Sequence, residues 1–407
     1  MNCLGNQKTM EANRTYSDIN DYLKSLLMDP MLWRRLTEDG LDDKIVGEEP
    51  VRKVVLLCAM GSKVINAKMT SYNLLINSAP GAGKDHTADN VLKSLPKGMV
   101  EKQTRISPTV FNYWKSRSPN WSWDGKVVYL EDISNSVLNS EVFKVMCSSG
   151  SKAVIVINQV AVELEVKGKP VIIVTSASAS PSAEMVRRFL VVSCDETEKQ
   201  TRDIMDRCVD LAITGKTSTE INNYHNALQF LNRVNVKLPD KIKLAVNHFP
   251  SKSLHMRTHF PRFLDLIKAS CAVHQFQREK ECDDTFIAQG EDFDIAREII
   301  LSTTTNSNMI PLTKDQRNVL DILKELPVKV NCEHGVEVES GYSLSELEPR
   351  IKFCGERQLR RYLDRLVELG FVIKKSEDRD NSRKAVMTFK ASEQVDDIKI
   401  PRWHELN

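Results

Sequence analysis

The segment at 78–85, S-A-P-G-A-G-K-D, has the residue types that hold a chain of phosphates. Gly81 and Gly83 let backbone N–H groups turn toward phosphate oxygens, and Lys84 supplies a positive charge. An apolar run, Y-N-L-L-I-N, precedes the segment, and a helical pattern, A-D-N-V-L-K-S-L, follows it. This is the strand–loop–helix context of a P-loop, in which the helix adds the positive end of its dipole. The alternative is a helix N-cap turn with an incidental lysine.

Two positions depart from the pattern G-x-x-x-x-G-K-[ST]. Ser78 replaces the first glycine, and Asp85 replaces the hydroxyl that ligates magnesium. A carboxylate is a good magnesium ligand, so Asp85 could hold the metal, or its charge could repel phosphate. We expect ATP and Mg²⁺ as cofactors. The residues expected to contact the nucleotide here are Ser78, Pro80, Gly81, Ala82, Gly83, Lys84, Asp85 and His86.

A second acidic motif, K-V-V-Y-L-E-D, lies downstream and has the form of a Walker-B strand. One carboxylate of such a pair organises magnesium and the next polarises the attacking water. Here Glu131 and Asp132 stand in the inverted order, and Glu131 is the expected metal ligand beside Asp85. The next apolar run, V-I-I-V-T-S, ends in hydroxyls, so Thr175 or Ser176 could hold the attacking water. The alternatives are that the two acids are merely solvated at a strand end and that the hydroxyls only form hydrogen bonds within the fold.

Two arginines precede the last apolar run, in E-M-V-R-R-F-L-V-V. From this place Arg187 or Arg188 could reach the γ-phosphate of a neighbouring subunit. The sequence offers Arg188 no obvious acidic partner. A salt-bridged surface arginine is the alternative.

Composition describes a soluble globular protein of two or three domains: 407 residues, 41% hydrophobic and 28% charged. The net charge of +2 is nearly neutral, so a nucleic-acid partner must be argued from local clusters. No run is long enough to span a membrane, and the polar N-terminus has no apolar leader, so we expect a cytoplasmic protein without a membrane partner. Nine cysteines are scattered, and Cys332, His334 and Cys354 fit no zinc pattern.

Buried strands alternating with helices between 72 and about 195 predict an α/β fold, with a parallel sheet covered on both faces. A short helical segment at 1–40 precedes this core at 41–195. A helical subdomain at 196–305 and a linker by composition at 302–308 follow. The last predicted domain spans 311–395.

That last domain reads as three helices followed by a charged β-hairpin, the pattern of a winged helix. Segment 351–390 holds eleven Lys/Arg against six Asp/Glu. The third helix would recognise DNA, and the hairpin would grip phosphates. A protein-interaction winged helix is the alternative. The candidate DNA contacts are Arg357, Arg360, Arg361, Arg365, Lys374 and Lys375, with Arg383 and Lys384 at the hairpin tip.

The order I-V-G-E-E-P-V-R-K, S-A-P-G-A-G-K-D, V-V-Y-L-E-D, V-T-S-A-S, R-R-F resembles the AAA+ core of minichromosome-maintenance (MCM) helicases. It is most similar to the divergent members carried by mobile elements. The resemblance covers about 45–300, and the winged helix extends it. It implies a hexameric or other ring of subunits with shared ATP sites, in which the helical subdomain is a lid.

The resemblance also implies residue roles. Lys84 is the Walker-A lysine, Glu131 and Asp132 are the Walker-B acids, Thr175 is the catalytic hydroxyl and Arg188 is the arginine finger. Arg262 is the sensor-2 arginine of the lid, with Arg257 as its competitor. A helix-packing or surface role is the alternative for either arginine. A hairpin within 153–169 would point at DNA, with Lys167 and Lys169 as phosphate contacts.

The leading hypothesis is a DNA-dependent ATPase, namely an MCM-like replicative helicase of a mobile element or plasmid. Its expected partners are DNA, further copies of itself and replication proteins. An origin-binding initiator or loader that does not unwind DNA is the second hypothesis. The third is a DNA-binding regulator whose degenerate ATP site is structural.

Overall fold

The computed structural model describes most of the chain, in two compact units. The described residues are 20–115, 118, 120–157, 159–177, 182–215, 222–249, 256–282, 284–305, 314–327, 329–333, 336–368, 371–377, 386–392 and 399–406. The first unit comprises 1–309 together with 399–407, and the second comprises 310–398. The chain therefore leaves the first unit once and returns to it at its end.

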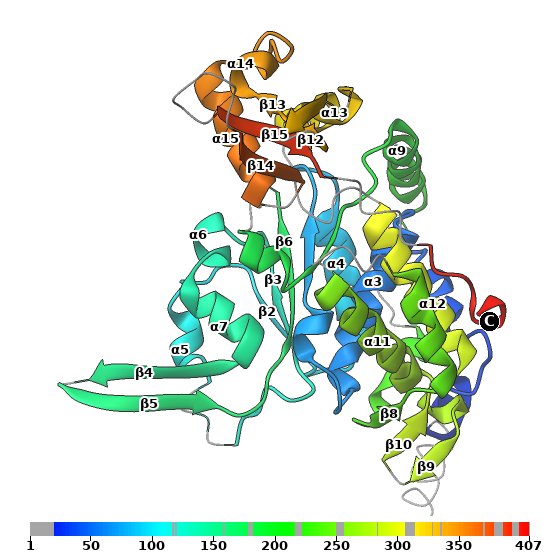
Figure 1. Ribbon diagram of the computed structural model, residues 1–407. Coiled ribbons are helices and arrows are strands. Elements are labelled where there is room, and N and C mark those ends of the chain that lie inside the picture. Colours follow the sequence, from blue (N-terminus) through cyan, green and yellow to red (C-terminus); the bar gives the residue numbers. More distant parts are fainter. Residues whose placement is uncertain are drawn as a thin grey trace, which may run out of the picture. The chain divides into compact units, whose positions relative to one another are not determined.

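Five strands form a parallel sheet in the first unit, in the order β2-β3-β6-β1-β7 (Figure 1). Four of them coincide with the predicted apolar runs, and β2 was missed because V-E-K-Q is only partly buried. The carboxyl ends of all five strands lie at one edge, here called the nucleotide edge. The strands are β1 (Leu74–Asn77), β2 (Val100–Gln103), β3 (Val127–Leu130), β6 (Val171–Ser176) and β7 (Leu190–Val192).

Helices cover both faces of this sheet (Figure 1). On one face, α3 (Glu49–Met60) packs against α4 (Lys84–Lys93). On the other, alternate strand side chains such as Val128 and Ile172 join the buried rings of Phe111 and Phe143. Those rings belong to α5 (Val110–Tyr113) and α7 (Glu141–Ser149), with α6 (Asn135–Leu138) beside them. Burial on both sides explains why the central strands are continuously apolar.

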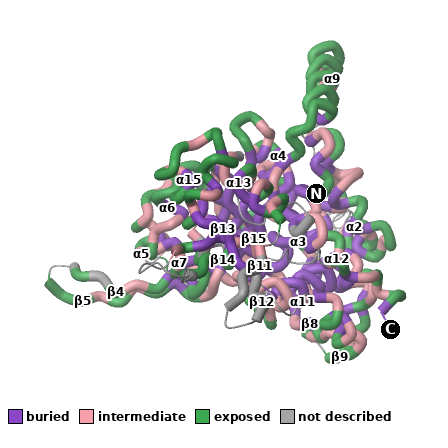
Figure 2. The backbone as a smooth tube through the Cα atoms, turned by 45° about the horizontal axis from the view of Figure 1, so that its top comes forward, coloured by how far each residue is buried: buried purple, intermediate pink, exposed green. Residues whose placement is uncertain are grey.

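A two-stranded hairpin follows α7, formed by β4 (Ser151–Ile157) and β5 (Val160–Val166). Its base is buried, whereas Val154, Val156 and Val160 are exposed (Figure 2). A short helix, α8 (Ala183–Val186), lies between β6 and β7. The half-exposed strand pair expected within 153–169 is therefore present.

Residues 196–305 are mostly helical, and they belong to the same compact unit as the sheet. The helix α9 (Glu198–Thr214) is exposed along nearly its whole length, with Gln200 its buried residue (Figure 2). In contrast, α11 (Met256–Val273) packs on α3 and on α12 (Gly290–Thr305). A small sheet in the order β8-β10-β9 was not predicted. The remaining elements are α10 (Asn223–Ala227), β8 (Asn235–Lys237), a 3-10 helix (Asp240–His248), β9 (Lys280–Cys282) and β10 (Thr285–Ile287).

The predicted N-terminal segment does not stand apart. Its described part contains a helix from residue 20, α2 (Leu32–Arg34) and a π-helical turn (Arg35–Asp39). Leu27 and Leu36 from this segment are fully buried in the first unit. The segment 1–40 is therefore part of the core as far as it is described.

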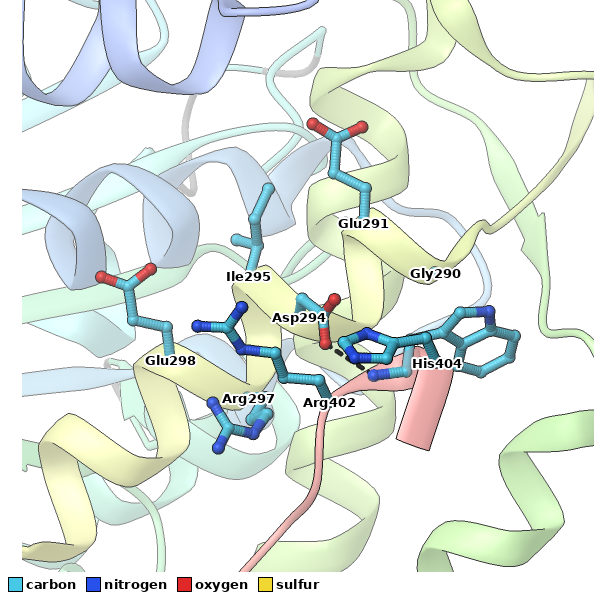
Figure 3. A pocket seen from close by; sticks show the side chains of 9 residues that line it. Gly290, Glu291, Asp294, Ile295, Arg297, Glu298, Arg402 and His404 are labelled. Carbon is cyan, nitrogen blue, oxygen red and sulfur yellow. Dashed lines mark hydrogen bonds between the residues drawn. The ribbon is translucent and has the colours of Figure 1, made fainter. Parts of the chain in front are cut away.

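The chain's last residues form a strap on α12, which no pattern in the sequence predicted. The ring of Trp403 lies against Phe293, with centroids 5.4 Å apart, and Trp403 N donates to Asp294 Oδ1 at 2.9 Å. Ile400 and Leu406 are buried on either side. A hollow of about 530 Å³ lies between α12 and the strap, and none of the P-loop residues lines it (Figure 3).

The second unit has the element order helix, hairpin, strand, helix, helix, strand, strand. Leu359, Leu363 and Leu366 from one face of α15 are fully buried against the sheet β13-β15-β14 and α13. The hairpin β11–β12 was not predicted. The elements are α13 (Lys314–Glu325), β11 (Lys329–Glu333), β12 (Val336–Ser340), β13 (Tyr342–Ser343), α14 (Leu344–Leu347), α15 (Glu356–Glu368), β14 (Val372–Glu377) and β15 (Val386–Ala391).

Across the described ranges, no helix combines the length and apolarity needed to cross a membrane. The same ranges contain no group of three His, Cys, Asp or Glu side chains that could hold a metal ion. Of the dismissed zinc candidates, His334 lies outside the described residues.

Candidate nucleotide-binding site

The glycine-rich loop joins β1 to α4 at the nucleotide edge, as predicted. Gly81 and Gly83 have φ of 87° and 81°, the left-handed region that favours glycine. Gly83 is the N-cap of α4 and no described side chain caps the helix, so its first N–H groups face the loop. Lys84 begins the helix and is buried. Open N–H groups at a helix start beside a lysine are suited to binding phosphate.

Ser78 also has a role within the fold. Its hydroxyl is buried and accepts a hydrogen bond from Cys194 N at 2.7 Å, just beyond β7. The serine at the first-glycine position therefore ties the start of the loop to the end of the neighbouring strand. Its expected contact with the nucleotide stays a prediction.

A carboxylate already occupies part of the loop. Ala79 N donates to Glu196 Oε1 at 2.9 Å, and Glu196 follows β7 by four residues. Backbone N–H groups of such a loop are the donors that a phosphate would use. Glu196 was missed in the sequence, although the acidic D-E after the last core strand could have drawn attention to it.

Lys84, Asp85 and Thr175 form a connected network at the nucleotide edge. The ammonium of Lys84 lies 3.5 Å from Asp85 Oδ2, and the Thr175 hydroxyl donates to the other oxygen of Asp85. Thr175 Oγ1 in turn accepts from Asp132 N at 2.9 Å. The first turn of α4 and the ends of β3 and β6 are thus joined through one threonine. Ser176, the alternative to Thr175, donates instead to Ile133 O at 3.2 Å.

The two Walker-B acids point to different surroundings. Glu131 pairs with Lys102 on β2, whose Nζ lies 3.3 Å from Glu131 Oε2 and 2.6 Å from Asp89 Oδ1. These two carboxylates raise the pKa of Lys102 despite its partial burial. Asp132 has φ of 48° and is exposed at the nucleotide edge.

The residues present fit a metal that arrives with its nucleotide. Mg²⁺ usually keeps several waters and takes one or two carboxylates plus phosphate oxygens, not a cage of protein ligands. Asp85 and Glu131 were expected to share the metal. Asp85 is paired with Lys84 and Glu131 with Lys102, so each carboxylate would have to leave its lysine to reach the metal.

Two further residues at this site were not predicted. The Tyr129 hydroxyl is buried on β3 without a hydrogen-bond acceptor among the described residues, and burial together with the nearby charge of Asp85 raises its pKa well above the usual value. Glu48, in I-V-G-E-E, accepts from Asp195 N at 2.9 Å, and burial raises its pKa to about 7. In the sequence, only the tyrosine within the apolar run V-V-Y-L and the doubled glutamate in I-V-G-E-E could have indicated these two residues.

His86 joins α4 to the segment before α3. Its ring Nε2 lies 2.9 Å from Lys44 O, and the side chain is exposed. The imidazole therefore positions the 44–48 segment beside the loop.

Arg188 lies at the edge opposite the nucleotide edge. It precedes β7, whose Leu190 N donates to Asn73 O ahead of β1 at 2.8 Å. Four strand residues, roughly 13 Å, separate it from its own loop. Contrary to expectation it has a local acidic partner, because Glu184 Oε1 accepts from both terminal nitrogens at 2.9 and 3.0 Å.

Arg262 does not reach the nucleotide edge. Its guanidinium is buried in the core, one nitrogen donates to Arg187 O at 3.1 Å, and burial lowers its pKa to about 10. Its expected role as a nucleotide contact is therefore contradicted, since it lies at the opposite edge. Its competitor Arg257 is exposed.

The two hairpin lysines lie at the base of β4–β5 and differ in exposure. Lys169 donates to Thr70 Oγ1 and to Ser148 O, and burial lowers its pKa to about 8, so it is a structural residue and not a free phosphate contact. Lys167 is exposed, and its carbonyl accepts from Trp123 N at 2.8 Å.

The basic residues of the second unit are mostly on its surface. Arg357, Arg360, Arg361 and Lys375 are exposed, while Arg365 is half-buried and engaged. Lys374 pairs with Asp364 at 2.8 Å, which leaves its ammonium less available for a DNA phosphate than predicted. Arg383 and Lys384 lie outside the described residues.

Residues 28–230 match the family model described as the MTBMA_p00010 P-loop domain. This range contains the whole five-stranded sheet, the glycine-rich loop and the ends of β3 and β6. A search of curated proteins found no match. The chain therefore contains a P-loop domain of the class that binds nucleoside triphosphates, with an α/β fold.

Proposed function

We propose that this protein is an AAA+ type ATPase that acts on DNA. The observation that carries the proposal is the meeting of Lys84, Asp85, Thr175 and Asp132 at one edge of the sheet. The placement of β6 between β1 and β3 supports it, because that order brings a hydroxyl between the phosphate loop and the acids.

Each residue has a defined task in this proposal. MgATP supplies the γ-phosphate that is transferred to water. Lys84 and the loop N–H groups bind the phosphates, and Asp132, exposed at the edge, orients the attacking water and accepts its proton. Thr175 holds the Asp132 backbone and Asp85 in register. Asp85 and Glu131 are the carboxylates available to the metal once their lysine partners release them.

Arg188 is proposed to act on the site of a neighbouring subunit. Its position at the opposite edge excludes a reach to its own loop, and an arginine finger can contribute about 10³–10⁵ in rate. Arg188→Ala should bind ATP but not turn it over. Mixing it with Lys84→Ala protein should restore activity, because a mixed interface can pair an intact loop with an intact arginine. Arg187→Ala is the control, and turnover by a monomer would contradict the idea.

The second unit is proposed to be a winged helix that binds duplex DNA. Its helix, strand, helix, helix, strand, strand core and the exposed arginines on α15 support this. Arg360→Ala with Arg361→Ala should weaken duplex binding and lower the log–log salt slope by about 0.9 for each phosphate that the variant no longer binds. An unchanged slope would favour a protein partner.

Within this class, the more specific function that we propose is that of an MCM-like helicase. The second candidate is a nucleotide-binding switch or loader. The contacts that occupy Lys84 and Ala79 N favour slow turnover, which suits the second candidate. ATP turnover with and without single-stranded and duplex DNA tests the common proposal. A strand-displacement assay then separates unwinding from loading.

A further inference from the structure

A row of cations surrounds Trp121 at the edge of the sheet opposite the P-loop. Lys115 Nζ lies 4.0 Å from the centroid of the Trp121 ring and Lys126 Nζ lies 5.1 Å from it. Lys126 directly precedes β3, which places this group at the amino ends of the strands. The lysine–tryptophan patch is defined as Lys63, Lys115, Trp121, Lys126 and Arg233.

Arg233 and Lys63 extend the row beyond Lys126. The Arg233 side chain passes over Gly125, where a Cβ would meet its Cδ at 3.2 Å. Burial lowers the pKa of Lys63, and the charges of Arg233 and Lys126 lower it further. Cations that repel one another in this way are close together and only partly neutralised.

Few acids among the described residues balance these charges. Lys115 lies 3.4 Å from Glu101, and Arg233 lies 3.5 Å from Asp124. Lys63 and Lys126 donate to backbone carbonyls, those of Leu231 and Gly98. Within the described chain, four cations thus face two carboxylates, an excess of two positive charges.

The patch also holds donors that nothing in the described chain satisfies. The indole Nε1 of Trp121 and the Nε of Arg233 are buried without an acceptor. Buried donors are normally paired, so two unpaired donors in one small patch are unusual. Ser122, next to Trp121, forms a backbone bridge with Lys167, an exposed residue at the hairpin base.

We propose that the lysine–tryptophan patch binds single-stranded nucleic acid. Spaced cations track the phosphates, and a phosphate that draws the Lys115 ammonium off the half-buried indole would give a base a ring on which to stack. Bases of a single strand can reach such a ring, whereas those of a duplex cannot. An acidic peptide would use the cations but not the indole, and is therefore less well matched. The choice of ligand rests on the proposed function, whereas the patch itself does not.

The test measures binding of a fluorescein-labelled oligothymidylate of about 20 nucleotides, a length that spans more than one site. The full-length Lys126→Gln, Arg233→Gln double variant should bind at least about tenfold more weakly at low salt. Its log–log salt slope should fall by about 0.7 for each phosphate that the variant no longer binds. Lys199→Gln with Lys243→Gln, which removes two exposed cations elsewhere in the unit, should bind like wild type.

Trp121→Phe is the second variant, and it should weaken binding several-fold with an unchanged salt slope. Basal ATP turnover should stay unchanged in the Lys126→Gln, Arg233→Gln variant, because the patch is outside the nucleotide site. Binding by the double variant equal to that of the control pair would overturn the proposal. So would equal competition by polyglutamate, which would indicate an acidic protein partner.

The outcomes also separate this inference from the proposed function. If wild-type protein binds no DNA of any kind, both fail. If it binds DNA and responds to Arg360→Ala with Arg361→Ala but not to the patch variants, only this inference fails.

Discussion

The hydroxyl of Thr175, at the end of β6, donates a hydrogen bond to the carboxylate of Asp85 in the first turn of α4. The same hydroxyl accepts from Asp132 N, so one buried side chain connects the phosphate loop to the acidic strand. Asp85 stands where such loops usually have a hydroxyl, and its second oxygen faces Lys84. The departure from the usual loop is therefore built into a network and is not an isolated exposed acid.

Asp85→Thr should bind nucleotide more tightly in the absence of magnesium. The substitution removes a negative charge that competes with phosphate for Lys84. A partly exposed pair of this kind contributes about 0.5–1 kcal/mol, which corresponds to about a two- to fivefold change in Kd. Titration of each variant with a fluorescent ADP analogue in the presence of EDTA measures this Kd. Glu141→Gln, an exposed acid of α7, is the control, and weaker binding by Asp85→Thr would show that the carboxylate does not compete.

Thr175→Val keeps the shape of the side chain and removes the hydroxyl. Asp132 N and Asp85 would each lose a partner that water can partly replace, and a hydrogen bond of this kind contributes about 0.5–1.5 kcal/mol. We expect the free energy of unfolding to fall by this amount, with ATP bound almost as before and turnover reduced about tenfold or more. Thr175→Ser, which restores the hydroxyl, should recover turnover. A Thr175→Val enzyme with wild-type turnover would remove Thr175 from the mechanism.

Glu196→Gln should strengthen nucleotide binding. The Glu196 carboxylate accepts the N–H of Ala79, so a phosphate must displace it. A neutral amide is a weaker acceptor and does not repel phosphate, and we expect Kd for ATP to fall about threefold to tenfold. Glu198→Gln, an exposed acid two residues further along, is the matched control. If Glu196→Gln binds ATP no more tightly than Glu198→Gln, the Glu196 carboxylate does not compete with phosphate for the N–H of Ala79.

The pKa of Glu48 leads to a prediction for stability. Its ordinary value is 4.5, and burial raises it to about 7. Between these values the folded chain holds a proton that the unfolded chain has released. The free energy of unfolding therefore falls as the pH rises through this window.

Glu48→Gln should remove that dependence, because the amide keeps an acceptor for Asp195 N but cannot ionise. The variant should be more stable than wild type at pH 8, by up to about 3 kcal/mol, and the difference should vanish near pH 4.5. Urea unfolding at several pH values measures this. The neighbouring Glu49→Gln is the control, and a variant whose pH profile runs parallel to that of wild type would contradict the assignment.

Patterns among neighbouring residues predicted the helices, strands and turns that such short stretches of sequence determine. The buried strands, the Gly81–Gly83 turn and the amphipathic α15 follow from apolar periodicity and glycine placement. Contacts between distant segments were not predictable, because no periodicity encodes them. The pairs Glu196 with Ala79 and Arg262 with Arg187 join residues more than seventy positions apart. The strap at Trp403 was missed for the same reason.

Several side chains that were expected to contact nucleotide or DNA already have a partner within the fold. Arg188 pairs with Glu184 one helical turn earlier, Lys169 donates to Thr70 at the hairpin base, and Ser78 accepts from Cys194 N. A motif specifies which side chain stands at a position, but burial and neighbours decide whether it is available.

The Lys84 loop is proposed to bind and hydrolyse ATP. The most direct measurement is ATP turnover and equilibrium ATP binding for wild type and Lys84→Ala side by side. Lys93→Ala, an exposed lysine of the same helix, is the control. We predict magnesium-dependent turnover by wild type and by the control, and no turnover with weakened binding for Lys84→Ala. Turnover and binding by Lys84→Ala equal to those of wild type would contradict the claim.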